Sequence, residues 1–289
     1  MNDNSSRYAK LLEVKFNSQN IISGACLREY LLEKCRVVHQ SEQELNFHIF
    51  YWMLAGLTPE ECRSCLLDQN KPYRYLGGNV QKTATHMTLD NKQKFWEVKE
   101  SLKNLGFTQD DITSVINVLA TVLHIGNITF SKDAKDNAQV TNQEALRNVS
   151  LTLRIPFEDL MSALVEDTII TRGEQTKIYL TVDQAVDSCD ALAKTLYSRL
   201  FSWIVNGINQ MVQPEEDSVN SNLSIGILDL FGFENLQTNS FEQMCINIAN
   251  EQLQMYFVDH VFKLEEADCV SEGIESCSVS VPWTDLAIS

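Results

Sequence analysis

A short apolar run that ends in an aspartate and a glycine constrains this chain of 289 residues most strongly. Leu223 to Leu228 is rich in isoleucine and leucine and too short for a helix, and turn-forming residues 214–222 precede it. Such a run predicts a strand buried on both faces, which favours a parallel or mixed sheet. Asp229-Leu-Phe-Gly232 follows, and many nucleoside triphosphatases use this layout to sense the terminal phosphate. Alone the pattern is weak, because strands often end in Asp and Gly for turn reasons.

The opening segment strengthens this interpretation. Residues 1–7 read Met-Asn-Asp-Asn-Ser-Ser-Arg, a polar loop that offers hydroxyl ligands for a hard cation, amide donors for phosphate and one guanidinium. Leu12, Val14 and Phe16 then alternate with polar residues, which predicts a strand closed by a turn over residues 17–20.

These two segments together resemble a known family. Residues 2–7 with Lys10 resemble switch I of a myosin motor, Asp229 to Glu234 resembles its switch II, and residues 239–252 are similar to the start of its relay helix. The resemblance covers residues 1 to about 275 and is strongest to unconventional myosins of class III, VII or XV. We expect the tail, residues 276–289, to diverge from the family.

The resemblance implies an α/β fold. It is the fold of a P-loop NTPase-like myosin head fragment, with a mostly helical upper 50-kDa region and a few strands of the central sheet. The expected domains are the switch I loop and following strands (1–24), the helical upper actin-binding region (25–212), a surface loop (213–222), a strand with switch II (223–239), the relay helix (240–268) and a divergent tail (269–289).

Apolar periodicity and capping signals give a more detailed expectation. They predict helices over 25–38, 42–55, 90–105, 108–125, 182–212 and 240–268. A hairpin is predicted over 168–180, and residues 131–141, with Lys132 and Lys135, are predicted to form an irregular surface loop.

The family pattern implies ligands for ATP and Mg²⁺. Ser6 would bind Mg²⁺ through its hydroxyl and Asp229 would hold the magnesium shell, since hard cations select oxygen ligands. The pattern places Asn2 and Ser5 at the phosphates and the attacking water, and Asn4 and Lys10 among the nucleotide-binding residues.

The same pattern implies a closing ion pair. Arg7 and Glu234 carry complementary charges and would form the salt bridge that closes the back of the site. The Gly232 N–H would bind the γ-phosphate. With Ser5, these three residues form the expected catalytic set, which acts by positioning and electrostatics.

One element of a nucleotide site does not occur in the sequence. The 289 residues contain no Gly-x-x-x-x-Gly-Lys-Ser/Thr sequence, a loop that lies upstream of switch I in a myosin. We therefore expect a piece of an actin-activated ATPase that lacks the P-loop, converter and lever arm and binds ATP poorly alone. The alternative is a catalytically inactive truncated isoform or partial gene model that acts, if at all, in protein interaction. A small GTPase-like switch is disfavoured because no Asn-Lys-x-Asp sequence occurs.

Charge and composition restrict the partners. The net charge of −16 argues against nucleic acid and anionic membrane. The longest apolar stretch, near residues 200–205, is too short to span a bilayer, so we expect no membrane insertion. The resemblance to myosins implies a cytoplasmic location on the actin cytoskeleton. Cys62 and Cys65 have zinc-like spacing without a second pair.

The resemblance also implies contacts with the actin filament. They would be local and made by the hairpin 168–180 and the loop 131–141; light chains are not expected on this segment. Glu174 lies sixteen residues before Asp190, at a position that in some myosins is phosphorylated. A glutamate there supplies a fixed negative charge. The expected actin-contact residues are Arg172, Gly173, Glu174 and Gln175.

Overall fold

The structure is a computed structural model that describes residues 5–41, 44–78, 88–171, 174–214, 223–236 and 239–274. The chain divides into two compact units. We call residues 11–227 the helical unit, and residues 1–10 together with 228–289 the terminal unit.

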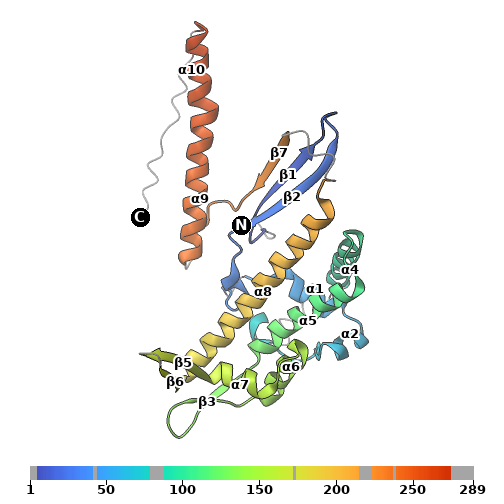
Figure 1. Ribbon diagram of the computed structural model, residues 1–289, viewed down its shortest axis with the longest axis vertical. Coiled ribbons are helices and arrows are strands. Elements are labelled where there is room, and N and C mark those ends of the chain that lie inside the picture. The colour runs from blue at the N-terminus through green and yellow to red at the C-terminus, as the bar shows by residue number, and fades with distance from the viewer. Residues whose placement is uncertain are drawn as a thin grey trace. The chain divides into compact units, whose positions relative to one another are not determined.

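The helical unit begins with strands and continues mainly as helices (Figure 1). The strands and short 3₁₀ segments up to residue 229 are β1 (Ala9–Phe16), β2 (Ile22–Tyr30), η1 (Lys34–Val37), η2 (Arg74–Leu76), β3 (Phe130–Lys132), β4 (Ala138–Val140), β5 (Glu166–Thr171), β6 (Glu174–Tyr179) and β7 (Ser224–Asp229). The first two residues of β1 and the last two of β7 belong to the terminal unit. The helices of the helical unit are α1 (His48–Gly56), α2 (Pro59–Ser64), α4 (Leu89–Asn104), α5 (Gln109–Gly126), α6 (Gln143–Leu153), α7 (Phe157–Val165) and α8 (Val182–Val212).

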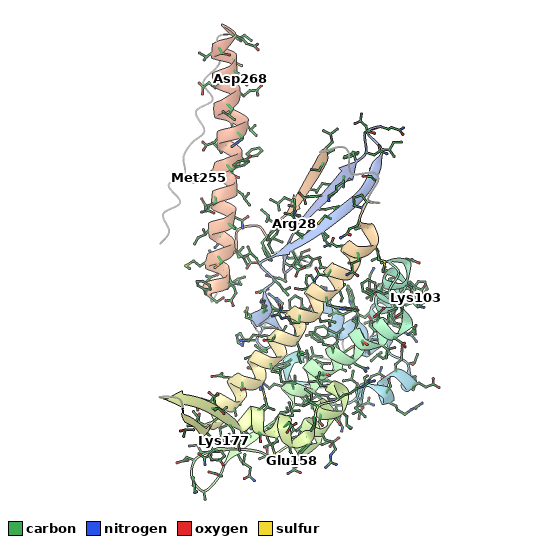
Figure 2. All side chains as sticks on the ribbon, in the orientation of Figure 1. Arg28, Lys103, Glu158, Lys177, Met255 and Asp268 are labelled. Carbon is green, nitrogen blue, oxygen red and sulfur yellow. The ribbon has the colours of Figure 1, made fainter. Side chains whose placement is uncertain are left out.

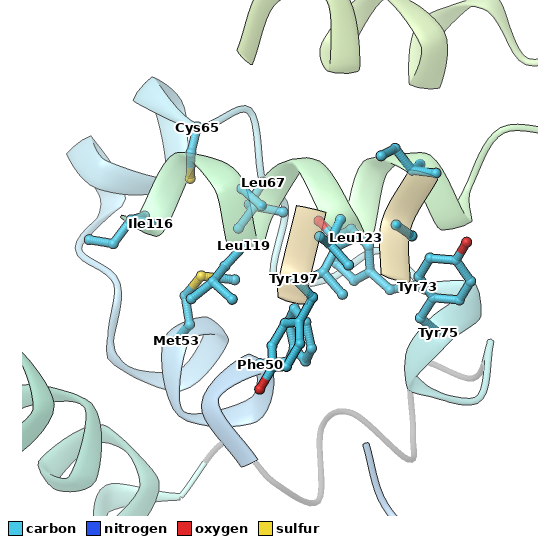
Figure 3. Packing of buried hydrophobic residues seen from close by; sticks show 14 of the residues in the cluster. Phe50, Met53, Cys65, Leu67, Tyr73, Tyr75, Ile116, Leu119, Leu123 and Tyr197 are labelled. Carbon is cyan, nitrogen blue, oxygen red and sulfur yellow. The ribbon is translucent and has the colours of Figure 1, made fainter. Parts of the chain in front are cut away.

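One hydrophobic core holds the helices of this unit together. Apolar side chains recur along α5 at helical spacing and are buried against α6 and α8. Tyr197 of α8 stacks on Phe47 with ring centroids 4.5 Å apart and also contacts Phe50. Figure 3 shows the rings of Phe50 and Tyr197 near Leu119 and Leu123 of α5.

The predicted helix ends are correct where a local capping signal marks them. Thr108 and Asp111 form the predicted capping box at the start of α5, and Thr181 caps α8. The helix predicted over 90–105 is α4, after which Gly106 adopts a φ of 87°. The hairpin predicted over 168–180 is β5 with β6, where Glu166 pairs with Tyr179.

The helix predicted over 25–38 is wrong. Residues 22–30 form β2, which pairs with β1, and Leu31 has a φ of 54° that no α-helix admits. The helix predicted from residue 42 begins only at His48, since Phe47 before it has a non-helical ψ of 131°. The Asn46 side chain donates to the backbone carbonyls of Val37 and Tyr75.

Two expectations about strands also need correction. β7 is an edge strand of the sheet β2–β1–β7, and all six of its residues are exposed rather than buried. It runs antiparallel to β1. The Phe16 N–H at the end of β1 donates to the Leu223 carbonyl just before β7, whereas Leu11 near the start of β1 lies beside Gly226 within β7. An apolar run shows that a strand is hydrophobic, but it does not show which other parts of the protein cover the strand's faces.

The loop predicted over 131–141 contains strands β3 and β4. They pair with each other, with Phe130 opposite Val140 and Lys132 opposite Ala138.

The terminal unit contains one long helical segment. α9 (Phe241–Val258) continues through a π-helical turn (Asp259–Lys263) into α10 (Leu264–Ser271), with right-handed helical backbone at both junctions. Figure 2 labels Met255 on α9 and Asp268 on α10. This confirms a helix over the predicted span 240–268, and the π turn was not predicted. No described helix of the chain is long and apolar enough to cross a membrane.

Candidate functional site

The predicted ion pair between Arg7 and Glu234 is present in the terminal unit. Arg7 Nη1 lies 2.8 Å from Glu234 Oε1, and the two side chains are 18% and 12% exposed. Arg7 lies two residues before the start of β1, and Glu234 follows the end of β7 by five residues. Because solvent screens this pair only partly, the hydrogen bond between its charges is stronger than one on an open surface.

Two side chains of α9 hold Glu234 from the other side. The Glu234 N–H donates to Asn247 Oδ1, and Asn247 Nδ2 donates to the Glu234 carbonyl, each at 2.8 Å. Gln243 Nε2 donates to Glu234 Oε2 at 3.4 Å. Sequence reasoning missed both contacts; the capping signal of Ser240 and Gln243 located the helix but not the side-chain partners of the glutamate.

Asp229 pairs with Lys10. Lys10 Nζ lies 3.1 Å from Asp229 Oδ2, and the side chains are 39% and 51% exposed. The sequence predicted Lys10 as a nucleotide-binding residue and did not predict this pair, since it depends on the pairing of two strands more than 200 residues apart. An ion pair this exposed contributes about 0–1 kcal/mol to stability.

A small apolar cluster anchors these segments to the helix. Ala9, Phe231 and Ile246 are buried together, and Leu230 packs against them. The φ of Ala9 is not positive, so its backbone conformation suits an alanine. An added Cβ at Gly232 would meet no atom of the described residues within 4 Å, so the backbone there is open on its outer side.

The remaining nucleotide-site candidates lie at the start of the chain. Ser5 and Ser6 are exposed, whereas Asn2 and Asn4 lie outside the described residues. The hydroxyl of Ser6 and the carboxylate of Asp229 are hard oxygen donors, the type that Mg²⁺ prefers. The donor set therefore fits the expected ion.

The two candidate actin-contact segments are both short β-hairpins. In the first, Glu174 pairs with Thr171 and Gln175 with Ile170 through the backbone, while Arg172 and Gly173 lie outside the described residues. Lys177, labelled in Figure 2, binds Glu166 across this hairpin at 2.9 Å. In the second, Lys132 pairs with Asp136 at 3.1 Å.

Cys62 and Cys65 do not form a metal site with other described residues, among which no group of three or more metal-ligating side chains occurs. Cys65 is buried, and burial raises the pKa of its thiol to about 11. The zinc-like spacing therefore reflects a helix end, at which the Cys65 thiol donates to the Cys62 carbonyl.

Comparison with known proteins decides the family. The family model described as the myosin head (motor domain) matches residues 1–286. The chain belongs to the myosin head family.

It is 43% identical to Myosin-IIIb of Mus musculus over 288 residues, which is 96% of this chain and 22% of that protein. It is 44% identical to Myosin-IIIa of Homo sapiens over 285 residues, 96% of this chain and 18% of that protein. Myosin-VIIa of Drosophila melanogaster is 41% identical over 278 residues, 94% of this chain and 13% of that protein.

These matches confirm the expected resemblance to unconventional myosins and correct its extent. The chain spans about a fifth or less of the length of these relatives. The match to the family model of the myosin head runs to residue 286, beyond residue 275, near which the resemblance was expected to end.

Proposed function

We propose that this chain is the part of an ATP-driven, actin-based myosin motor that carries switch I, switch II and the start of the relay helix. The ion pair between Arg7 and Glu234 carries the proposal, because it joins the two segments that sequence reasoning assigned to the switches. Such a motor works in the cytoplasm on the actin cytoskeleton.

The proposed nucleotide site uses the residues of both segments. Ser6 and Asp229 would hold Mg²⁺, which neutralises charge on the phosphates when it is bound. Asn2, Asn4 and Ser5 would contact the phosphates, and the Gly232 N–H would face the terminal one. Their neighbour Lys10 balances the charge of Asp229 through its ion pair.

The Arg7–Glu234 pair would orient the attacking water and exclude bulk solvent. Glu234 keeps its carboxylate fixed by Arg7 at one oxygen and by Gln243 at the other. Holding reacting groups in place converts binding energy into rate, and phosphoryl transfer depends mainly on such positioning and on electrostatics.

The proposed contacts with actin lie on the two hairpins, residues 168–180 and 131–141. With a net charge of −16, broad attraction to another acidic surface is unfavourable, so a binding surface must be local. A hairpin presents few residues at a defined place and fits that need. Arg172, Gly173, Glu174 and Gln175 would form the tip.

The test uses a complete motor head that contains this segment. We expect it to sediment with actin filaments without nucleotide, to be released by Mg-ATP, and to hydrolyse ATP faster when actin is added. Ser6→Ala should abolish the Mg-ATP effects while sedimentation persists. Arg28→Ala, which removes an ion pair with Glu13 on the β1–β2 hairpin, is the matched control and should behave as the unchanged head.

Two results would contradict the proposal. A head that is not released by Mg-ATP would support the alternative of a non-catalytic interaction protein. Equal behaviour of Ser6→Ala and the unchanged head would remove residues 5–7 from the nucleotide site.

A further inference from the structure

Asn247 makes two hydrogen bonds to the backbone of Glu234. Its carboxamide accepts the Glu234 N–H and donates to the Glu234 carbonyl, with both distances at 2.8 Å. A neutral side chain needs a donor and an acceptor side by side to make this pair, and asparagine and glutamine carry them. With both backbone groups of residue 234 held, the direction in which its side chain leaves the backbone is restricted.

Hydrogen bonds from Gln243 and Arg7 restrict the carboxylate of Glu234 as well. Gln243 lies one turn before Asn247 on the same face of α9, and its side chain is 4% exposed. Gln243 Oε1 accepts the Ser240 N–H at 2.8 Å, so its amide nitrogen is left to face Glu234 Oε2. Arg7 binds the other oxygen.

A helix is a better support for this glutamate than its own loop. Residues 230–236 form no helix or strand, so their backbone groups need partners from elsewhere. Asn239 binds Leu236 by a similar pair, but it lies in the same connecting segment only three residues away. Asn247 instead lies in the second turn of α9, which regular hydrogen bonds keep rigid.

We propose that Asn247 is a positioning residue for Glu234, which fixes the glutamate backbone so that its carboxylate meets the Arg7 guanidinium. This inference rests on the proposed function, in which the Arg7–Glu234 pair supports hydrolysis. Asn247 contacts neither nucleotide nor water in this scheme and acts through the glutamate.

The experiment measures kcat and KM for Mg-ATP in the complete motor head, together with hydrogen exchange of the Glu234 amide. We expect Asn247→Ala to speed that exchange and to lower kcat by up to about 100-fold, with KM changed less than about twofold, because a small misplacement of a catalytic group costs rate. Asn247→Asp keeps the size and the acceptor but loses the donor, so its kcat should fall as well.

The matched control is Asn209→Ala, which removes the same kind of double hydrogen bond from the helical unit. It should leave exchange at Glu234 unchanged. In an Arg7→Ala head, Asn247→Ala should cause no further loss of kcat, a result that general destabilisation would not give.

The possible failures can be told apart. If Arg7→Ala abolishes hydrolysis while both Asn247 variants keep full kcat, the role of Asn247 is wrong and the proposed function stands. Additive losses in the Arg7→Ala, Asn247→Ala head also refute the role. If Arg7→Ala and Glu234→Ala leave hydrolysis unchanged, the proposed function itself fails. Should Asn247→Ala unfold the head, Asn247→Asp decides by the same criteria.

Discussion

Asn209 on α8 holds the backbone of Leu27 on β2 by two hydrogen bonds. The Leu27 N–H donates to Asn209 Oδ1 at 2.7 Å, and Asn209 Nδ2 donates to the Leu27 carbonyl at 2.8 Å. Both residues belong to the helical unit, in which α8 lies along β2. The carboxamide thus takes the place that a neighbouring strand would have, and it satisfies two backbone groups of β2.

Asn209→Ala should therefore destabilise the helical unit. It leaves one backbone donor and one acceptor of Leu27 without their protein partner, which we expect to lower the free energy of unfolding by about 2–3 kcal/mol. Urea denaturation followed by circular dichroism measures the change. Asn104→Ala, at the exposed end of α4, is the control and should change stability by less than about 0.5 kcal/mol. If Asn209→Ala and Asn104→Ala lower the free energy of unfolding equally, the Asn209 contact with Leu27 contributes little to stability.

His124 should make stability depend on pH. Burial lowers the pKa of His124, although its Nε2 hydrogen bond to the Cys65 carbonyl at 3.0 Å opposes this. The unfolded chain then binds a proton that the folded chain excludes, so stability is complete above about pH 6.5 and falls as pH decreases through that value. Stability should therefore be lower at pH 5.5 than at pH 7.5, and part of that loss should be attributable to His124.

Urea denaturation at the two pH values tests this. His124→Gln should remove that part of the pH dependence, whereas His39→Gln, at an exposed position, should keep it. An unchanged pH dependence in His124→Gln would mean that His124 titrates normally in the folded chain.

Gly24 should tolerate no side chain. An added Cβ would lie 2.6 Å from the Pro214 backbone nitrogen and 2.8 Å from the Val212 carbonyl oxygen, and neither is a flexible side-chain atom. Gly24→Ala should therefore cost about 1–3 kcal/mol through overpacking. At Gly226 the nearest atom would be Leu11 Cδ1 at 3.4 Å, an ordinary contact, so Gly226→Ala should cost much less. Thermal unfolding compares the two variants, and a similar loss in both would argue against close packing at Gly24.

Glu174 should matter for actin rather than for nucleotide. In a complete motor head, Glu174→Ala should reduce actin-activated ATP turnover several-fold while basal turnover stays nearly unchanged, because the fixed charge replaces a phosphate at the expected contact. Glu100→Ala removes an equal charge from α4, where Glu100 pairs with Lys103, and should change neither rate. Equal loss of both rates, or no change in either, would place Glu174 outside the actin interface.

Local signals explain which parts of the fold were predictable. The Thr108 side chain accepts the N–H three residues ahead and marks the start of α5, and apolar residues at helical spacing mark α8, so both helices could be placed from sequence. β2 could not, since its conformation depends on β1 and on Asn209, which lies 182 residues away from Leu27. The exposure of β7 depends on which elements pack against it. The residue pattern of one strand does not predict those elements.

The candidate site shows the same division. The Arg7–Glu234 pair was predictable because the resemblance supplied both loops and their charges are complementary. The role of Asn247 and the pairing of Lys10 with Asp229 were not, because each requires knowing which atoms of distant segments meet. From sequence, an asparagine on a helix is usually predicted to face solvent. Its hydrogen-bond partner can be identified only from the structure.

The Arg7–Glu234 pair is the central claim, and a double-mutant cycle on single-turnover ATP hydrolysis tests it most directly. The measurement compares the complete motor head with Arg7→Ala, Glu234→Ala and the double variant, at saturating Mg-ATP. If the two charges act as one unit, each single change should lower the rate by about 100-fold or more and the double variant should be no slower than the slower single variant. Losses that multiply in the double variant, or single variants with the unchanged rate, would contradict the account.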